Sequence, residues 1–150
     1  MIKELLLRVP GLEVAVSATT REQRPGEQNG REYWFLSPDE FERRVQAGEF
    51  LEYVTYVSGH RYGTLRSEVD RISANGNTPL LELETDGALR VREHVPGAVT
   101  VFISAPASEL ERRLTERATE SAGEALERAD ADVIVMAAAS NPIPGSETSL

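Results

Sequence analysis

Short apolar runs alternate with helix-like segments along the chain, and this alternation constrains the fold more than any other feature of the sequence. Three runs of strand length, 79–83, 99–103 and 133–139, are separated by segments with helical spacing of apolar residues. Strands that alternate with helices are typical of an α/β fold, because each helix carries the chain back and successive strands then run parallel. The sequence therefore predicts an α/β domain with a mainly parallel sheet.

One stretch departs from this rhythm, because two strand-like segments, 31–36 and 49–57, lie close together with a helix between them. Ser37 can cap the start of that helix, and Pro38 suits its first position. Gly48 is expected to end it. This pattern predicts a small inserted sheet with its own helix.

Glycines mark several turns between the other elements. The loop over 21–30 ends in Asn29-Gly30, a pair typical of hairpin turns. A second loop is expected around Gly59 and Gly63, followed by a helix from Leu65. We therefore place no strand between residue 57 and that helix.

Composition narrows the class of protein. The chain has 150 residues and no cysteine, so disulfides and thiolate metal sites are excluded. Its net charge of −9 argues against a broad nucleic-acid surface, although local arginines can still bind a small phosphate compound. No apolar run is long enough to span a bilayer, and the first residues lack the pattern of a secretory signal. These features predict a cytoplasmic single domain with no nucleic-acid or membrane partner.

Two arginines, Arg21 and Arg24, lie three positions apart in the loop that follows the first expected strand. Ligands bind at this edge of open α/β sheets, and two guanidinium groups from one loop suit a phosphate dianion. Tyr33 and Tyr62 can add hydroxyl donors. The sequence thus predicts a phosphate site, with a solvated arginine-bearing loop as the alternative interpretation.

Glu52 stands in the middle of an expected strand, between Leu51 and Tyr53. A carboxylate there can accept two hydrogen bonds from the N1 and 2-amino edge of guanine, a pair of donors that adenine does not offer. The alternative is an ordinary strand residue that faces solvent.

Further charged residues have two interpretations each. Glu82 and Glu84 alternate along a strand and point to one side of it, which suits a Mg²⁺–water shell or a ligand hydroxyl. The alternative is a strand with one solvent-exposed face. Arg113 and Arg117 share one helix face, with Arg128 further along, and can be catalytic or solvated. No direct metal ligand is assigned.

Taken in order, these segments resemble the guanylate kinase family. The resemblance covers roughly residues 1–135, and its run from Ser17 to Thr64 is highly specific. The matching motifs are Ser17-Ala-Thr-Thr-Arg21-x-x-Arg24-Pro25-Gly26-Glu27, Asn29-Gly30-x-x-Tyr33-x-Phe35, Gly48-Glu49-Phe50-Leu51-Glu52-Tyr53, Tyr62-Gly63-Thr64, Leu81-Glu82-Leu83-Glu84, Gly87-Ala88, and Arg113-Leu114-x-x-Arg117 with Arg128.

The resemblance implies a nucleoside-monophosphate-kinase-like parallel sheet with an inserted mixed β/α subdomain. The guanylate-kinase-like domain would span 1–139, with the GMP-binding subdomain at 31–64 and a lid-like region at 108–129. Residues 140–150 are expected to form a disordered tail.

The resemblance also implies the roles of single residues. A GMP phosphate clamp would consist of Arg21, Arg24, Tyr33 and Tyr62. Ser17, Glu52 and Thr64 would read the guanine. Arg113, Arg117 and Arg128 would be catalytic, stabilising the phosphoryl group in transfer. The implied reaction is that of a transferase of purine nucleotide metabolism, ATP + GMP = ADP + GDP, with Mg²⁺ accompanying ATP.

Three departures from the family pattern stand beside the resemblance. The family begins with a strand and a Gly-rich loop ending in Lys-Ser/Thr, which holds the phosphates of ATP, and the 150 residues contain no such motif. Glu84 stands where the family usually has aspartate, and Asp86 where it usually has glutamine. The chain after Arg128 is shortened.

These departures give expectations of their own. Without the first, central strand and without the loop that holds the phosphates of ATP in the family, we expect a weakly stable monomer with little or no GMP kinase activity of its own. Exposed sheet edges predict self-association. Two alternatives stay open, a non-catalytic module that binds a protein or phosphopeptide partner, and a partial gene product.

Overall fold

The computed structural model describes residues 2–103 and 133–136. The elements in these ranges follow one another as α1 (Ile2–Arg8), β1 (Leu12–Val14), β2 (Ala18–Thr19), β3 (Trp34–Phe35), α2 (Pro38–Gln46), β4 (Phe50–Thr55), β5 (Arg61–Leu65), α3 (Arg66–Ala74), β6 (Thr78–Leu83), α4 (Thr85–His94), β7 (Val99–Phe102) and β8 (Val133–Met136). None of the helices in the described ranges is long and apolar enough to cross a membrane. The expected lid-like region and the expected tail lie outside the described residues.

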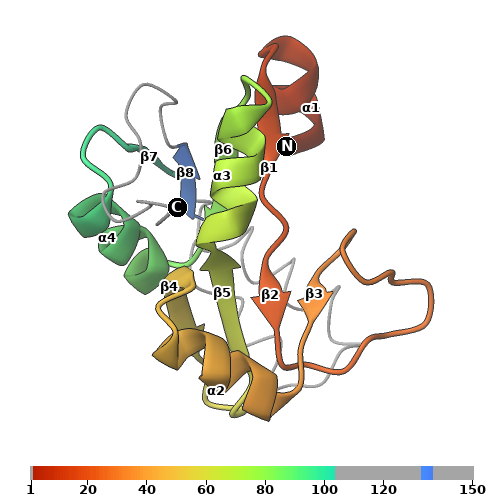
Figure 1. Cartoon of the computed structure of the whole chain (residues 1–150). Helices are drawn as coiled ribbons and strands as arrows, with labels where there is room; N and C mark the ends of the chain where they lie inside the picture. Colours follow the sequence, from red (N-terminus) through yellow and green to blue (C-terminus); the bar gives the residue numbers. More distant parts are fainter. Residues whose placement is uncertain (1, 104–132, 137–150) are drawn as a thin grey trace, which may run out of the picture.

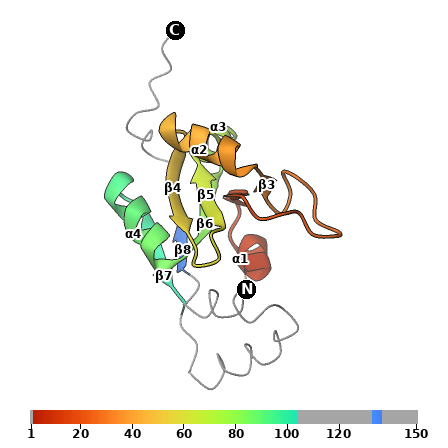
Figure 2. The same cartoon turned by 90° about the horizontal axis from the view of Figure 1, so that it is seen from below.

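The strands form two four-stranded sheets, one with the order β1-β6-β8-β7 and one with the order β3-β2-β5-β4. Figures 1 and 2 show the second sheet with α2 at one end of the molecule and the first sheet with α4 beside it. In the first sheet β1 and β6 are parallel, with Leu12 opposite Thr78 and Val14 opposite Leu80. The predicted α/β architecture with an inserted mixed sheet is confirmed.

The strand β8 lies between β6 and β7 and runs antiparallel to both. Val135 pairs with Leu81 of β6 on one side and with Thr100 of β7 on the other. The expected opening at the centre of this sheet is therefore occupied by β8. Ladder hydrogen bonds form in either strand direction, so a strand from late in the chain can fill this place.

The second sheet differs from expectation at two glycines. The strands on either side of Asn29-Gly30, β2 and β3, run parallel, with Ala18 opposite Trp34, so the hairpin turn predicted there is wrong. Gly63 was expected in a loop but lies inside β5. A Cβ at this position would lie 2.7 Å from the backbone oxygen of Glu52, which leaves no room for a side chain. The close approach of β4, and not a turn, requires this glycine.

The helix α2 forms as its sequence predicts. The Oγ atom of Ser37 accepts a hydrogen bond of 3.1 Å from the backbone N–H of Glu40, and Pro38 occupies the first turn. The helix buries Phe41, whose ring stacks on Phe50 of β4 with centroids 4.3 Å apart. Packing of this kind fixes α2 against the second sheet.

A hydrophobic core joins the two sheets. It brings together Val69 and Ile72 of α3, Val91 of α4, Leu81 of β6 and Leu51 of β4. Each such side chain contributes about 1.5–3 kcal/mol when it is fully buried. Because Leu51 belongs to the second sheet and Leu81 to the first, this core holds the two sheets at a fixed angle, and the site lies where they meet.

Candidate functional site

A hollow of about 480 Å³ opens at the junction of the two sheets. It is lined by the link between β1 and β2, by β4 and β5, and by the end of β6 with the first turn of α4. Its volume lies in the range of small-molecule sites in proteins. The carboxyl ends of β1 and β6 meet here, as expected for a ligand site on an open α/β sheet.

The structure brings six of the nine predicted site residues that lie within its described ranges to this hollow. The side chains that line it come from both sheets and from the loop before β3. Of the predicted set, the hollow is lined by Ser17, Tyr33, Glu52, Tyr62, Glu82 and Glu84. Thr64 is buried opposite Glu52 in the β4–β5 pairing and donates a hydrogen bond to its carboxylate.

Glu52 is a buried carboxyl group, with 5% of its surface exposed. Its Oε1 atom has no hydrogen-bond partner among the residues that the structure describes. Burial raises the pKa of Glu52, and the hydrogen bond from Thr64 opposes this shift only in part. An acceptor atom that is buried without a partner destabilises the protein, so the hollow favours a ligand that donates hydrogen bonds to Glu52.

Gly87, in the first turn of α4, makes room for this carboxylate. A Cβ at Gly87 would lie 3.0 Å from Oε2 of Glu52, closer than side-chain contacts normally are. The absence of a side chain at this position thus lets the helix approach Glu52 and close one side of the hollow.

The two tyrosines of the expected phosphate clamp lie together at the hollow. The rings of Tyr33 and Tyr62 meet edge to face, with centroids 5.8 Å apart. The guanidinium carbon of Arg21 lies 5.4 Å from the centroid of the Tyr33 ring, and Arg21 also contacts Tyr62 through a hydrogen bond. Arg21 therefore contacts both tyrosines but does not itself line the hollow.

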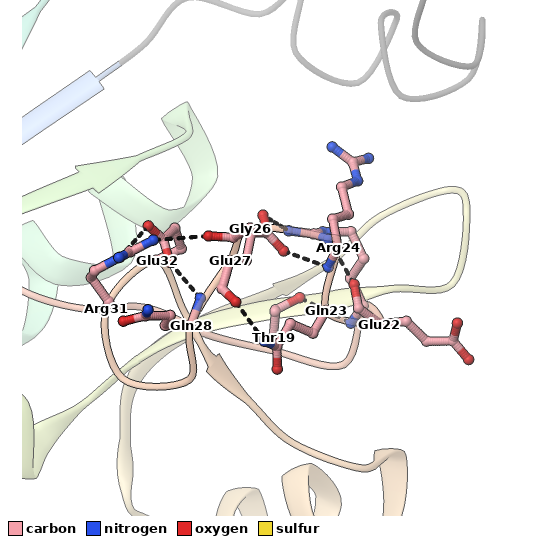
Figure 3. A network of polar contacts seen from close by, with 10 residues as sticks. Thr19, Glu22, Gln23, Arg24, Gly26, Glu27, Gln28, Arg31 and Glu32 are labelled. Atoms are coloured by element: carbon pink, nitrogen blue, oxygen red, sulfur yellow. Dashed lines mark hydrogen bonds and ion pairs between the residues drawn. The ribbon is translucent and has the colours of Figure 1, made fainter.

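The two arginines of that expected clamp line a different hollow from the tyrosines, between their own loop, the start of α2 and the turn before β5. Arg21 has 5% of its surface exposed, and it donates hydrogen bonds to the backbone oxygen of Glu22 at 2.7 Å and to Oε1 of Glu27 at 2.8 Å. Burial alone would lower the pKa of Arg21, but the contacts with Glu27 and Tyr62 outweigh burial and raise it. In Figure 3 the side chain of Arg24 extends away from the Glu27 carboxylate.

A contact with a Mg²⁺–water shell or with a ligand hydroxyl was expected for Glu82 and Glu84 near the end of β6, without a direct metal ligand. Glu82 and Glu84 both line the hollow, but residues 2–103 and 133–136 contain no group of three or more His, Cys, Asp or Glu side chains that could hold a metal ion. Proteins that bind Mg²⁺ with nucleotides usually supply one or two carboxylates and leave the remaining positions to phosphates and water. The two glutamates fit that partial role.

A protein-family model described as guanylate kinase matches residues 1–140 of the chain. The chain belongs to the guanylate kinase family.

Curated guanylate kinases from bacteria are similar to this member of the family. The enzyme of Rubrobacter xylanophilus is 49% identical over 122 residues, which are 81% of this chain and 63% of the relative. That of Symbiobacterium thermophilum is 48% identical over 120 residues, 79% of this chain and 56% of the relative. The chain thus spans 56–63% of the length of these two relatives.

A solved structure supports the same family. The crystal structure of guanylate kinase from Anaplasma phagocytophilum matches with a TM-score of 0.52 and 32% sequence identity, over 61% of this chain and 47% of that one. This similarity supports the nucleoside-monophosphate-kinase-like fold of the chain.

Sequence reasoning missed several residues that line the hollow of this guanylate kinase family chain, among them Arg31, Glu32, Tyr56 and Gly87. Tyr56 follows a strand end and Arg31 precedes Tyr33 by two positions, which are weak signals. Gly87 belongs to the matching Gly87-Ala88 motif, but that motif gave no indication of a place in the site. The three arginines expected to be catalytic, Arg113, Arg117 and Arg128, lie outside the described residues, and their role stays a prediction.

Proposed function

We propose that the hollow binds GMP, with the guanine against Glu52, Thr64 and Ser17 and the phosphate on the side of Tyr33 and Tyr62. The observation that carries this proposal is the Oε1 atom of Glu52, a buried acceptor that has no partner in the described part of the chain and lines a hollow of about 480 Å³. Family membership supports the choice of ligand.

Guanine fits this acceptor better than adenine does. Its N1–H and 2-amino groups are two adjacent donors, and an ionised carboxylate can accept both. Adenine has an acceptor at N1 and no 2-amino group, so it leaves Glu52 unsatisfied. A buried group left without its partner costs about 1–3 kcal/mol, which corresponds to a preference of about 5- to 150-fold.

The phosphate side uses neutral and charged donors. The hydroxyl groups of Tyr33 and Tyr62 are donors beside the hollow, and Arg21 lies behind them. For the phosphate to reach Arg24 as well, the loop that carries the arginines has to move toward the tyrosines. Closure of a subdomain over a bound nucleotide is a common step in enzymes that transfer phosphoryl groups.

We propose that the reaction served by this site is the transfer of a phosphoryl group from ATP to GMP, with Mg²⁺ near Glu82 and Glu84 and with Arg113, Arg117 and Arg128 stabilising the transferred group. A Gly-rich loop ending in Lys-Ser/Thr is not found within the 150 residues. We therefore expect these residues by themselves to bind GMP while turning ATP over slowly.

Titration calorimetry with GMP, guanosine and AMP tests the proposal. Folded protein should bind GMP and guanosine and should bind AMP at least tenfold more weakly. Glu52→Gln replaces an acceptor with a donor that faces the donors of guanine, so it should remove most of this preference. Glu93→Gln, which changes an exposed carboxylate on α4, is the matched control and should leave both affinities unchanged.

The alternative functions predict different results. A non-catalytic module for a protein or phosphopeptide partner would be favoured by a folded protein that binds neither GMP nor guanosine. A partial gene product would be favoured by the loss of a cooperative unfolding transition.

We also propose that the protein acts in the cytoplasm and associates with itself through the edges of the first sheet. Within the described strands, β1 and β7 lie at the two edges of that sheet. Val99, Val101 and Phe102 of β7 are exposed, and an edge strand with exposed apolar side chains is prone to pair with another chain. Sedimentation velocity over a range of concentrations tests this proposal, and a monomer at all concentrations would contradict it.

A further inference from the structure

We propose that Glu27 is a positioning residue for the phosphate side of the site: its carboxylate holds the guanidinium group of Arg21 and the backbone of Arg24 in one fixed arrangement. The inference rests on the proposed binding of GMP, because it concerns how the same site holds the phosphate. Neither the chemistry of phosphate binding nor the spacing of the arginines requires an acid at this place.

Both oxygen atoms of Glu27 are used. Oε1 accepts a hydrogen bond of 2.8 Å from Nη2 of Arg21, and Oε2 accepts one of 2.8 Å from the backbone N–H of Arg24. Figure 3 labels Glu27 and Arg24 and marks the hydrogen bond between them with a dashed line. One carboxylate thus joins the two residues of the arginine pair that are three positions apart.

The rest of the loop is built around this carboxylate. The backbone N–H of Glu27 donates to the oxygen of Arg24, and its backbone oxygen accepts from the side chain of Gln23 at 2.5 Å. Gly26 supplies the turn that brings Glu27 back, with φ of 87°. The oxygen of Gly26 in turn accepts from Arg31, which lines the hollow, so the loop is connected to the site.

Glu27 acts on Arg21 by orientation and not by adding charge. The pKa of Glu27 is lowered, first by its hydrogen bond from Arg21 and then by that from the Arg24 backbone, so the carboxylate is ionised at neutral pH. The ion pair has no net charge. What it provides is a fixed guanidinium plane, which Tyr33 and Phe35 flank at 5.4 and 5.7 Å from their ring centroids.

The loss of Glu27 would release this arrangement. Arg21 would keep its contacts with the backbone oxygen of Glu22 and with Tyr62, and the backbone N–H of Arg24 would lose the Glu27 carboxylate as its acceptor. A guanidinium group that must be oriented again at the moment of binding gives up part of the free energy of the phosphate contact. GMP should therefore bind more weakly, while guanosine, which has no phosphate, should be unaffected.

Loss of the negative charge of Glu27 acts on GMP affinity in the opposite direction, and the experiment has to separate this effect from the loss of orientation. A carboxylate near the phosphate site also repels the phosphate, and removing it could tighten binding. Glu22 offers the matched control, because Glu22→Gln removes one negative charge from the same loop and leaves untouched the backbone oxygen that binds Arg21.

The test is the calorimetric affinity of Glu27→Gln, Glu27→Asp and Glu22→Gln for GMP and for guanosine. Glu27→Gln should lower the affinity for GMP about tenfold and change that for guanosine less than about twofold. Glu27→Asp keeps the charge with a shorter arm and should show an intermediate loss. Glu22→Gln should leave GMP affinity unchanged or slightly raised.

A double-mutant cycle with Arg21→Gln separates positioning from a general structural effect. In the Arg21→Gln background, Glu27→Gln should change GMP affinity less than about twofold, because the group that it positions is gone. Unchanged or tighter GMP binding by Glu27→Gln overturns the inference, and so does an equal loss of guanosine binding. If the unmodified protein binds guanosine but not GMP, or neither ligand, the proposed function fails first and the inference falls with it.

Discussion

The carboxylate of Glu68 accepts a hydrogen bond of 3.3 Å from the backbone N–H of Val16, although the two residues are 52 positions apart in the sequence. Glu68 is buried on α3, and Val16 belongs to the link between β1 and β2 that lines the hollow. Arg71 extends the connection, with Nη2 2.7 Å from Glu68 and Nη1 2.7 Å from Glu13 of β1. A polar network thus fixes the wall of the site to a helix behind it.

Glu68→Ala should destabilise the protein, because it leaves the Val16 N–H without an acceptor and Arg71 with one carboxylate in place of two. The expected loss is about 1–3 kcal/mol in the free energy of unfolding, measured by urea denaturation. Asp70→Ala, an exposed acid on the same helix, should change it by less than about 0.5 kcal/mol. Equal effects of the two variants would contradict the role given to the network.

The affinity for guanosine should depend on pH through Glu52. Burial raises the pKa of this carboxyl above its ordinary value of 4.5, while the proposed contact with guanine requires the ionised form. Affinity should therefore rise with pH until the raised pKa is passed and then level off, and binding below that pH should release a proton. Calorimetry in two buffers of different ionisation enthalpy counts this proton, and Glu52→Gln should abolish its release.

The raised pKa of Glu52 also makes the stability of the folded protein depend on pH. A carboxyl whose pKa is higher in the folded than in the unfolded state favours folding of its protonated form. The contribution of Glu52 is therefore fully present below the ordinary pKa of glutamate and is lost as the pH rises through the raised value. In Glu52→Gln this dependence should be absent between those two limits, as thermal unfolding across that range of pH can show.

Gly87→Ala should separate binding from stability. The added methyl group would crowd Oε2 of Glu52 at 3.0 Å and so displace the carboxylate that we propose accepts hydrogen bonds from guanine. Alanine also favours the helix by about 0.5–1 kcal/mol relative to glycine. We expect guanosine and GMP to bind several-fold more weakly to a protein that unfolds at the same or a slightly higher temperature. Leu89→Ala, at an exposed position of α4, serves as the control and should leave binding unchanged.

Gly63→Ala should damage the fold. Its Cβ would lie 2.7 Å from the Glu52 backbone oxygen and 2.8 Å from both Phe50 and Tyr53, at the centre of the pairing of β4 with β5. Forcing a methyl group into packed surroundings typically costs about 1–3 kcal/mol. The midpoint of urea denaturation should fall accordingly, and an unchanged midpoint would show that β4 and β5 can separate at this point without cost.

The parts of the fold that sequence reasoning predicted well are those fixed by local contacts. The start of α2 depends on Ser37, Pro38 and Glu40, which lie within one turn, so its cap could be predicted. Gly63 was interpreted as a loop residue because its reason, the approach of Glu52 from another strand, is not local. The pairing of β8 with β6 and β7 is likewise set by contacts between distant parts of the chain.

The site follows the same division. The resemblance predicted the carboxylate at Glu52 and the tyrosines at Tyr33 and Tyr62, and the structure places all three at one hollow. It did not predict that Glu27 would hold Arg21 outside the lining of this hollow, because that contact depends on how the loop folds back at Gly26. Spacing in the sequence gives residue types, whereas orientation comes from tertiary contacts.

The position of β8 has a consequence for how the protein is made. β7 ends at residue 102, but its sheet partner β8 ends at residue 136, 34 positions later. At a synthesis rate of about 5–20 residues per second, β7 and the inner edge of β6 wait roughly 2–7 s on the ribosome before β8 emerges to join them. During that interval β7 and the edge of β6 that β8 will cover are unpaired in the nascent chain. Slower translation or a shortage of chaperones should therefore lower the yield of native protein, although neither changes the equilibrium stability of the folded protein.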